Sequence, residues 1–224
     1  MPRFLLLCTL AFFLHGQTQA QSLINGKDLA GWKIKGDAKK SKWVNGQAAL
    51  DEKNPGKLAV TPVEAGGVLV SPASGVDIFT EEKFGSAVIE VEFMVPKGSN
   101  SGIYLMGEYE VQILDSYGKE KVGPGDVGGL YSAAAPRVNA AKKPGEWQKF
   151  LIDFDAPMFN DGKKTSNARF NKVVLNDQVI HDNVEIKGPT PSGLTGKEAA
   201  TGPLMFQGDH GPVAFRNLKV TGKK

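Results

Sequence analysis

The stretch FGSAVIEVEFMVPKGSNSGIYLMGEYEVQILDS, residues 84–116, decides the fold, because it holds two runs in which apolar and polar side chains alternate. In residues 87–95 the odd-numbered positions are apolar, and in residues 109–115 the same parity puts Val111 and Ile113 on one side and Glu110 and Gln112 on the other. A period of two is typical of an extended strand with one apolar and one polar face. The acid and amide side chains on the polar faces are Glu90, Glu92, Glu110 and Gln112. We therefore expect two neighbouring strands with a shared polar surface.

The segment between these runs, residues 98–102, consists of the small residues Gly-Ser-Asn-Ser-Gly. Glycine has no side chain, so such a segment lets a ligand approach the backbone closely. Tyr104 lies on the face opposite Ile103 and Leu105, which adds an aromatic group to the acids. Polar faces of antiparallel sheets usually meet only water, but this combination is a candidate ligand surface.

The rest of the chain indicates an all-β fold. Its 27 Gly and 13 Pro divide it into strand-length pieces, and no segment sustains a helical period. We expect Asn45-Gly46 and Asn176-Asp177 to be hairpin turns, and Trp32 and Trp43 to pack in the core rather than bind sugar rings. A chain of 224 residues is long enough for one substantial core, which predicts a single domain over residues 21–224.

Residues 1–20 are typical of a secretory signal peptide: Arg3 precedes an apolar run over residues 4–14, and Ala20 is a small residue suited to cleavage. The run is too short to span a bilayer, so we expect an exported protein, periplasmic or extracellular, with no membrane span after cleavage. Cys8 is the only cysteine, so the mature chain has no disulfide, which favours a bacterial exported enzyme. The net charge of +3, without clustered basic residues, disfavours nucleic acid as a partner.

The motifs NSGIYL and YEVQILD resemble the 3-keto-disaccharide hydrolase family. Further similar pieces follow in the family's order and extend the resemblance over most of residues 23–221. They are GLY at 129–131, PGEW at 144–147, IHDN at 180–183, GPL at 202–204 and FRN at 215–217. The resemblance implies a concanavalin-like or laminin-G-like jelly-roll sandwich of two antiparallel sheets.

The resemblance also implies an enzyme that cleaves 3-keto-glycosides or 3-keto-disaccharides. A ketone at C3 acidifies the proton on C2, so a base can remove it, the glycosidic oxygen on C1 can leave by elimination, and water can then add. Such chemistry needs a base with a pKa near neutrality, stabilisation of the enolate and a proton donor. It does not need the paired carboxylates of ordinary glycoside hydrolysis.

For this chemistry we expect His181 as general base and Glu110 as the acid/base carboxylate. The residues expected to bind the sugar are Asn100, Tyr104, Gln112, Gln207 and His210. A divalent cation at the keto group, held by Glu110 with His181 or His210, is an open alternative, since a metal stabilises an enolate.

Two other functions fit the same pattern. One is a conventional glycoside hydrolase, which the spacing of Glu90, Glu92 and Glu110 does not favour because it lacks the Glu-x-Asp-x-x-Glu pattern of such enzymes. The other is a non-catalytic carbohydrate-binding module, in which a concave face binds glycans by stacking and amide contacts alone. In all three cases the partner is a carbohydrate, and the sequence leaves the oligomeric state open.

Overall fold

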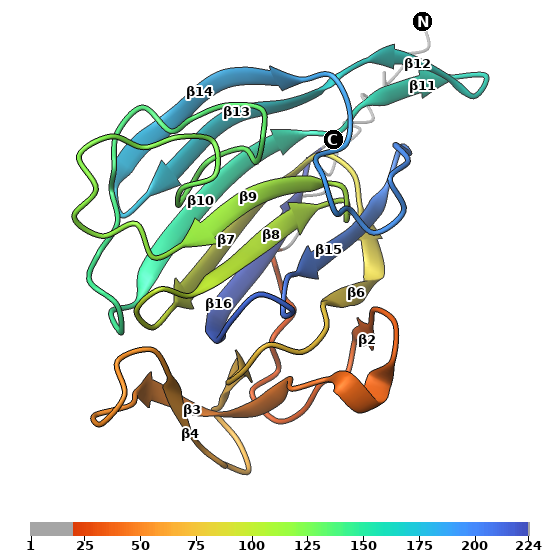
Figure 1. The fold of residues 1–224 in the computed structure, drawn as a ribbon. Coiled ribbons are helices and arrows are strands. Elements are labelled where there is room, and N and C mark those ends of the chain that lie inside the picture. The colour runs from red at the N-terminus through yellow and green to blue at the C-terminus, as the bar shows by residue number, and fades with distance from the viewer. Residues whose placement is uncertain (1–19, 224) are drawn as a thin grey trace, which may run out of the picture.

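The computed structural model describes residues 20–223, so the predicted signal peptide lies outside the described residues apart from Ala20. Two antiparallel sheets pack face to face (Figure 1). The prediction of an all-β jelly-roll sandwich is therefore confirmed. No helix within residues 20–223 has the length and apolar character needed to cross a membrane.

The larger sheet has nine strands in the order β14-β13-β10-β7-β16-β5-β3-β4, with β1 paired to β16. Its strands are β1 (Gln21–Ser22), β3 (Val44–Leu50), β4 (Leu58–Thr61), β5 (Val68–Ser71), β7 (Ala87–Met94), β10 (Gln148–Asp155), β13 (Ala168–Leu175), β14 (Gln178–Ile186) and β16 (Val213–Gly222).

The smaller sheet has five strands in the order β2-β6-β15-β8-β9. Its strands are β2 (Trp32–Ile34), β6 (Ile78–Phe84), β8 (Asn100–Leu105), β9 (Tyr109–Leu114) and β15 (Gly202–Phe206). A separate hairpin of β11 (Met158–Asn160) and β12 (Lys163–Ser166) projects from one end, and a short 3₁₀ helix, η1 (Ala38–Lys40), follows β2 (Figure 1).

Aromatic side chains join the two sheets through the core. Phe206 of β15 stacks on Phe215 of β16 with ring centroids 3.8 Å apart. Trp32 packs on Phe206, and Trp43 packs on Phe215. Each indole N–H donates to a backbone carbonyl, which satisfies the polar end of a mostly buried ring. Both tryptophans therefore belong to the core, as predicted.

The two alternating runs of the central stretch lie in different sheets, which corrects the expectation that they are neighbours. The apolar faces of β7 and β9 both point into the core. Their polar faces therefore point in opposite directions, away from the sandwich. Glu90 pairs with Lys149 and Glu92 with Arg216 on the outer face of the larger sheet.

One predicted turn is confirmed and one is wrong. Asn176 and Asp177 adopt left-handed φ values of 48° and 67° between β13 and β14. Asn45 and Gly46, in contrast, lie inside β3 and pair with β5. A side chain at Gly46 would collide with the backbone carbonyl of Thr61 on the neighbouring β4. The glycine therefore serves close packing beside β4 and not a turn.

Two long connections flank the smaller sheet. Residues 115–147 join β9 to β10 and are called the rim loop here. Residues 187–201 join β14 to β15 and are called the strap. Segments of both pair with β9 or its preceding turn: the Val111–Leu130 bridge belongs to the rim loop, and Leu194 of the strap donates its N–H to the carbonyl of Gly107.

Candidate active site on the five-stranded sheet

Strand register gathers four of the predicted site residues on the outer face of the smaller sheet. Tyr104 is directly opposite Glu110, and Gly102 is directly opposite Gln112. Asn100 shares the parity of Gly102 and Tyr104 on β8. Gln207, just beyond β15, donates its backbone N–H to the carbonyl of Gly102. None of these side chains belongs to the apolar cluster between the sheets.

Glu110 is the buried acid of this face, with only 2% of its surface exposed. Its carboxyl group leans over Gly102, where any side chain would collide with it. Burial raises the pKa of Glu110 to about 7, because desolvation disfavours the charged form. A hydrogen bond from Tyr104 and the nearby His210 lower that pKa, while Asp77 and Asp209 raise it further.

Tyr104 supplies a neutral hydroxyl beside this acid. It is 1% exposed, and its hydroxyl lies within hydrogen-bond reach of Glu110 and 3.4 Å from the carbonyl of Pro191 in the strap. Burial, followed by the negative charge of Glu110, holds the pKa of Tyr104 well above its usual value. The phenol therefore acts as a hydrogen-bond donor and not as an anion.

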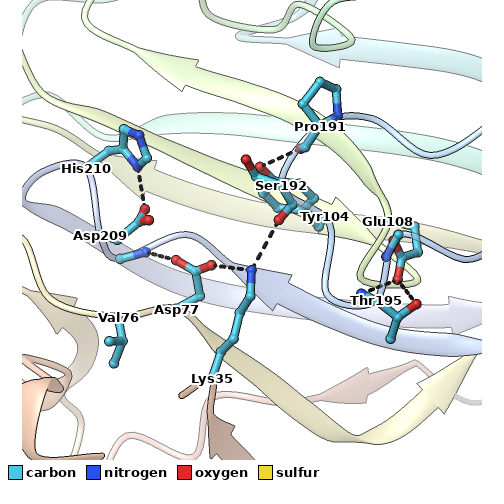
Figure 2. Close-up of polar contacts among 12 residues, drawn as sticks. Lys35, Val76, Asp77, Tyr104, Glu108, Pro191, Ser192, Thr195, Asp209 and His210 are labelled. Carbon is cyan, nitrogen blue, oxygen red and sulfur yellow. Dashed lines mark hydrogen bonds and ion pairs between the residues drawn. The ribbon is translucent and has the colours of Figure 1, made fainter. Parts of the chain in front are cut away.

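Lys35 and Asp77 extend the site, although no sequence motif marked them. Asp77 precedes β6 and accepts from the backbone N–H of Gly208 at 2.9 Å and from the ammonium of Lys35 at 3.0 Å. Lys35 also donates to the carbonyl of Ser192 in the strap at 3.1 Å. Figure 2 shows Lys35 between Asp77 and the strap. No local pattern predicts this pair, because Lys35 and Asp77 come from different segments that meet only in the folded sheet.

His210 lies in the turn after β15, with its ring paired to Asp209 (Figure 2). About half of each side chain is exposed. It is close enough to Glu110 for its charge to favour the ionised carboxylate. His210 and Asp209 thus form the open side of the cluster, where a ligand from solvent first meets it.

Three side-chain amide groups complete the site, and the oxygen atoms of two of them have no hydrogen-bond donor among the described residues. The side-chain oxygens of Asn100 and Gln207 are buried, and neither makes a hydrogen bond within residues 20–223. Buried acceptors normally have a donor, so both are suited to receive sugar or water hydroxyl groups. Gln112 is engaged internally, because its side-chain oxygen accepts from the backbone N–H of Ile113.

His181 is not placed with this cluster. It lies on β14, the edge strand of the larger sheet, opposite Val173, a core residue. Only 2% of it is exposed, and its Nε2 is 2.7 Å from the carbonyl oxygen of Gly128 in the rim loop. Burial lowers the pKa of His181, so the ring is a neutral group bound to the rim loop. The expected pairing of His181 with Glu110 is therefore not formed.

The donors present do not fit the metal site that the sequence left open. Across residues 20–223, no group of three or more His, Cys, Asp or Glu side chains is arranged to hold a metal ion. The carboxylate of Asp126 in the rim loop is bound by Ser116, Lys119 and the N–H of Gly123, and Asp115 accepts from the N–H of Gly98. Both carboxylates are thus engaged in hydrogen bonds that stabilise the loops around them.

A cavity of about 330 Å³ opens at one end of the same sheet, beside the strap. Its lining includes Glu108, Tyr109, Leu194 and Glu198 but neither Tyr104 nor Glu110. Glu108 and Glu198 both have their carboxylates engaged in hydrogen bonds with other residues. We therefore take the cluster around Glu110, and not this cavity, as the candidate site, because acid/base chemistry needs a titratable group near neutrality.

Comparison with known proteins gives a consistent result. Residues 19–221 match the family described as the 3-keto-alpha-glucoside-1,2-lyase-like domain. The structure is similar to that of a candidate glycosyl hydrolase from Parabacteroides distasonis, with 30% sequence identity and a TM-score of 0.69 over 91% of this chain and 84% of that chain. A second candidate glycosyl hydrolase from the same organism shares the fold, with 20% identity and a TM-score of 0.60 over 92% of this chain and 94% of that one. No curated protein matches the sequence.

Proposed function

Because the chain belongs to the 3-keto-alpha-glucoside-1,2-lyase-like family, we propose that it is a carbohydrate-active enzyme that cleaves the glycosidic bond of 3-keto-glycosides. The proposal places the reaction on the outer face of the five-stranded sheet. The observation that carries it is the buried carboxyl group of Glu110, which has a pKa of about 7 and lies beside the neutral phenol of Tyr104. The unpartnered amide oxygens of Asn100 and Gln207 belong to the same site.

A carboxyl group with this pKa is suited to accept a weakly acidic proton near neutral pH. In the proposed reaction, the carboxylate of Glu110 removes the proton from C2. The electrons of the C2–H bond form an enolate with the C3 ketone, and collapse of the enolate expels the oxygen on C1, which leaves a C1=C2 double bond. Addition of water across this bond, with hydroxyl to C1 and a proton to C2, then yields the free 3-keto-sugar.

The neighbouring groups supply the remaining roles. Tyr104 donates a hydrogen bond to the oxygen at C3, where negative charge develops. His210, on the exposed side of the cluster, donates a proton to the leaving oxygen. Asn100 and Gln207 accept hydrogen bonds from sugar hydroxyl groups.

Access to Glu110 requires a local movement, since Glu110 and Tyr104 are almost completely covered. The strap and the turn that carries His210 are the two segments beside them. We propose that the sugar enters from the side of His210, where the structure is open to solvent. The leader-like sequence of residues 1–20 supports an exported enzyme that meets its substrate outside the cytoplasm.

A panel of substrates tests this proposal. The mature protein is incubated with a 3-keto-glucoside, with the unoxidised glucoside and with a β-glucan, and free sugar is measured. Cleavage of the 3-keto-glucoside alone is the expected result. Cleavage of the other two indicates a conventional glycoside hydrolase, and binding without turnover indicates a carbohydrate-binding module.

A pair of matched variants tests whether Glu110 is the catalytic carboxyl group. Glu110→Gln removes the titrating group and keeps the size of the side chain, so turnover should fall by about a hundredfold or more while sugar binding remains. Glu90→Gln changes the corresponding acid on the outer face of the other sheet, where Glu90 pairs with Lys149, and should leave turnover unchanged. Equal effects of the two substitutions would contradict the assignment.

A further inference from the structure

The strap is fastened to the turn between β8 and β9 at two points. The first is Thr190, whose N–H and hydroxyl both donate to the carbonyl of Glu108, at 2.9 Å and 3.0 Å. The same hydroxyl accepts from the backbone N–H of Glu110 at 2.9 Å. Thr190 is buried, and this fastening binds the backbone of the residue that carries the candidate catalytic carboxyl group.

The second fastening point is the side chain of Glu108. Its carboxylate accepts from the N–H of Thr195 at 2.8 Å, from the hydroxyl of Thr195 at 2.6 Å and from the N–H of Gly196 at 3.0 Å. Gly193 packs so closely on this carboxylate that any side chain there would collide with it. Within residues 20–223 Glu108 has no ion pair, and it is 4% exposed. A buried carboxylate without a cation depends on these three donors.

Two of the four residues between the fastening points, Pro191 and Ser192, contact the candidate site. The carbonyl of Pro191 is 3.4 Å from the hydroxyl of Tyr104, and the carbonyl of Ser192 accepts from Lys35 (Figure 2). Ser192 has a left-handed φ of 65°, a conformation that a non-glycine residue keeps only where its surroundings hold it. The fastening by Glu108 therefore sets the position of these two carbonyls.

We propose that Glu108 is a positioning residue, which holds the strap against Tyr104 and Lys35 and thereby excludes water from Glu110. The proposal rests on the proposed role of Glu110 as the acid/base group, and it adds a residue that touches neither substrate nor reacting atoms. Its chemical basis is that release of the strap exposes Glu110 to water, which removes the desolvation that favours the neutral carboxyl form.

The titratable groups that act on Glu110 come from three segments. They are Tyr104 on β8, Asp77 before β6, and Asp209 with His210 after β15. Lys35, after β2, is paired with Asp77. Apart from the contacts of Tyr104 with Pro191 and of Lys35 with Ser192, none of these groups belongs to the strap or is bound to it. Loss of the strap should therefore change the hydration of Glu110 more than its ionic surroundings.

The test compares two carboxylates that fasten the strap: Glu108, which binds it from the turn between β8 and β9, and Glu198, which belongs to the strap and binds Tyr109 and Lys164. Glu108→Gln keeps the size of the side chain but replaces one acceptor oxygen with a donor. Glu198→Gln is the matched control, since Glu198 binds Tyr109 and Lys164 farther along the strap and away from Pro191. For each variant, the titration of Glu110 is followed by NMR of its side-chain carboxyl carbon, and amide hydrogen exchange is measured at Thr195 and Gly196.

In Glu108→Gln we expect the midpoint of the Glu110 titration to move from about 7 toward the ordinary value for glutamate, and exchange at Thr195 and Gly196 to accelerate by about tenfold or more. The acid limb of the pH profile of kcat/KM should move in the same direction. Glu198→Gln should leave the Glu110 titration in place. If the amides of Glu108→Gln exchange faster while the Glu110 titration is unmoved, the proposal is wrong.

Thr195→Val is a milder variant, which keeps the N–H donor to Glu108 and loses the hydroxyl donor, together with the contacts of that hydroxyl with the backbone of Lys197. It should shift the Glu110 titration in the same direction by a smaller amount, and it decides the question if Glu108→Gln does not fold. Because the titration is measured without substrate, the positioning role can fail or succeed independently of turnover. A Glu110 shift in a protein that cleaves no 3-keto-glycoside would refute only the proposed function.

Discussion

Glu110 and Glu90 are the same residue type in equivalent patterns, yet the protein shifts their pKa values in opposite directions. Glu90 lies on the outer face of the larger sheet, where a hydrogen bond from Lys149 lowers its pKa. Glu110 is buried beside Tyr104, and desolvation raises its pKa to about 7. The surroundings, and not the residue type, therefore identify the candidate acid/base group.

The raised pKa of Glu110 has a consequence for stability. Between the ordinary value of 4.5 and about 7, the folded protein keeps a proton on Glu110 that the unfolded chain has released. The free energy of unfolding therefore falls as pH rises through this window, by up to about 3 kcal/mol. We expect Glu110→Gln to remove this loss, so the variant should gain stability over the wild type at pH 8 relative to pH 5, measured by chemical denaturation. Parallel pH dependences of the two proteins would contradict the raised pKa.

His181 is expected to serve stability and not catalysis. Its Nε2 contacts the carbonyl of Gly128 in a buried position on the larger sheet. Replacing it with alanine leaves that carbonyl without its partner, which should lower the free energy of unfolding by about 1–3 kcal/mol. Turnover per folded molecule of His181→Ala should equal that of the wild type. A folded His181→Ala protein without turnover would return His181 to the role of general base.

At the scale of single elements, the sequence predicts strands better than their partners. The alternation in residues 87–95 and 109–115 correctly identifies β7 and β9 and their apolar faces. Alternation does not show which sheet a strand joins. The sequence therefore does not predict that the polar faces of β7 and β9 point in opposite directions. Asn45-Gly46 failed as a turn because pairing of β3 with β5 and close packing on β4 outweigh the local turn preference.

The turn at Asn176-Asp177 gives a prediction at this scale. Asp177 has a φ of 67°, which an aspartate adopts less readily than glycine, while the Asn176 side chain binds the N–H of Lys149 and the carbonyl of Ala140. Asp177→Gly should stabilise the protein by up to about 1 kcal/mol without changing turnover, because the turn lies in the larger sheet. A lower melting temperature in thermal denaturation of Asp177→Gly would contradict this account of the turn.

At the scale of the whole molecule, the sandwich assembles the site from segments that are distant in sequence. Asn100, Tyr104, Glu110 and Gln112 could be predicted because β8 and β9 are adjacent in sequence and paired. Lys35, Asp77 and the strap could not, since only β6 and β15 bring them to this face. The place of His181 could not be predicted for a related reason: a histidine on a strand looks the same in sequence whichever sheet that strand joins.

The central claim is that Glu110 acts as a base on the outer face of the five-stranded sheet. The most direct test is the pH dependence of kcat/KM for a 3-keto-glucoside with the wild type and with Glu110→Gln. Since the carboxylate is the reactive form, kcat/KM of the wild type should rise with pH through a midpoint of about 7. Glu110→Gln should show a low rate without this rise. An unchanged acid limb in Glu110→Gln, at a comparable rate, would contradict the account.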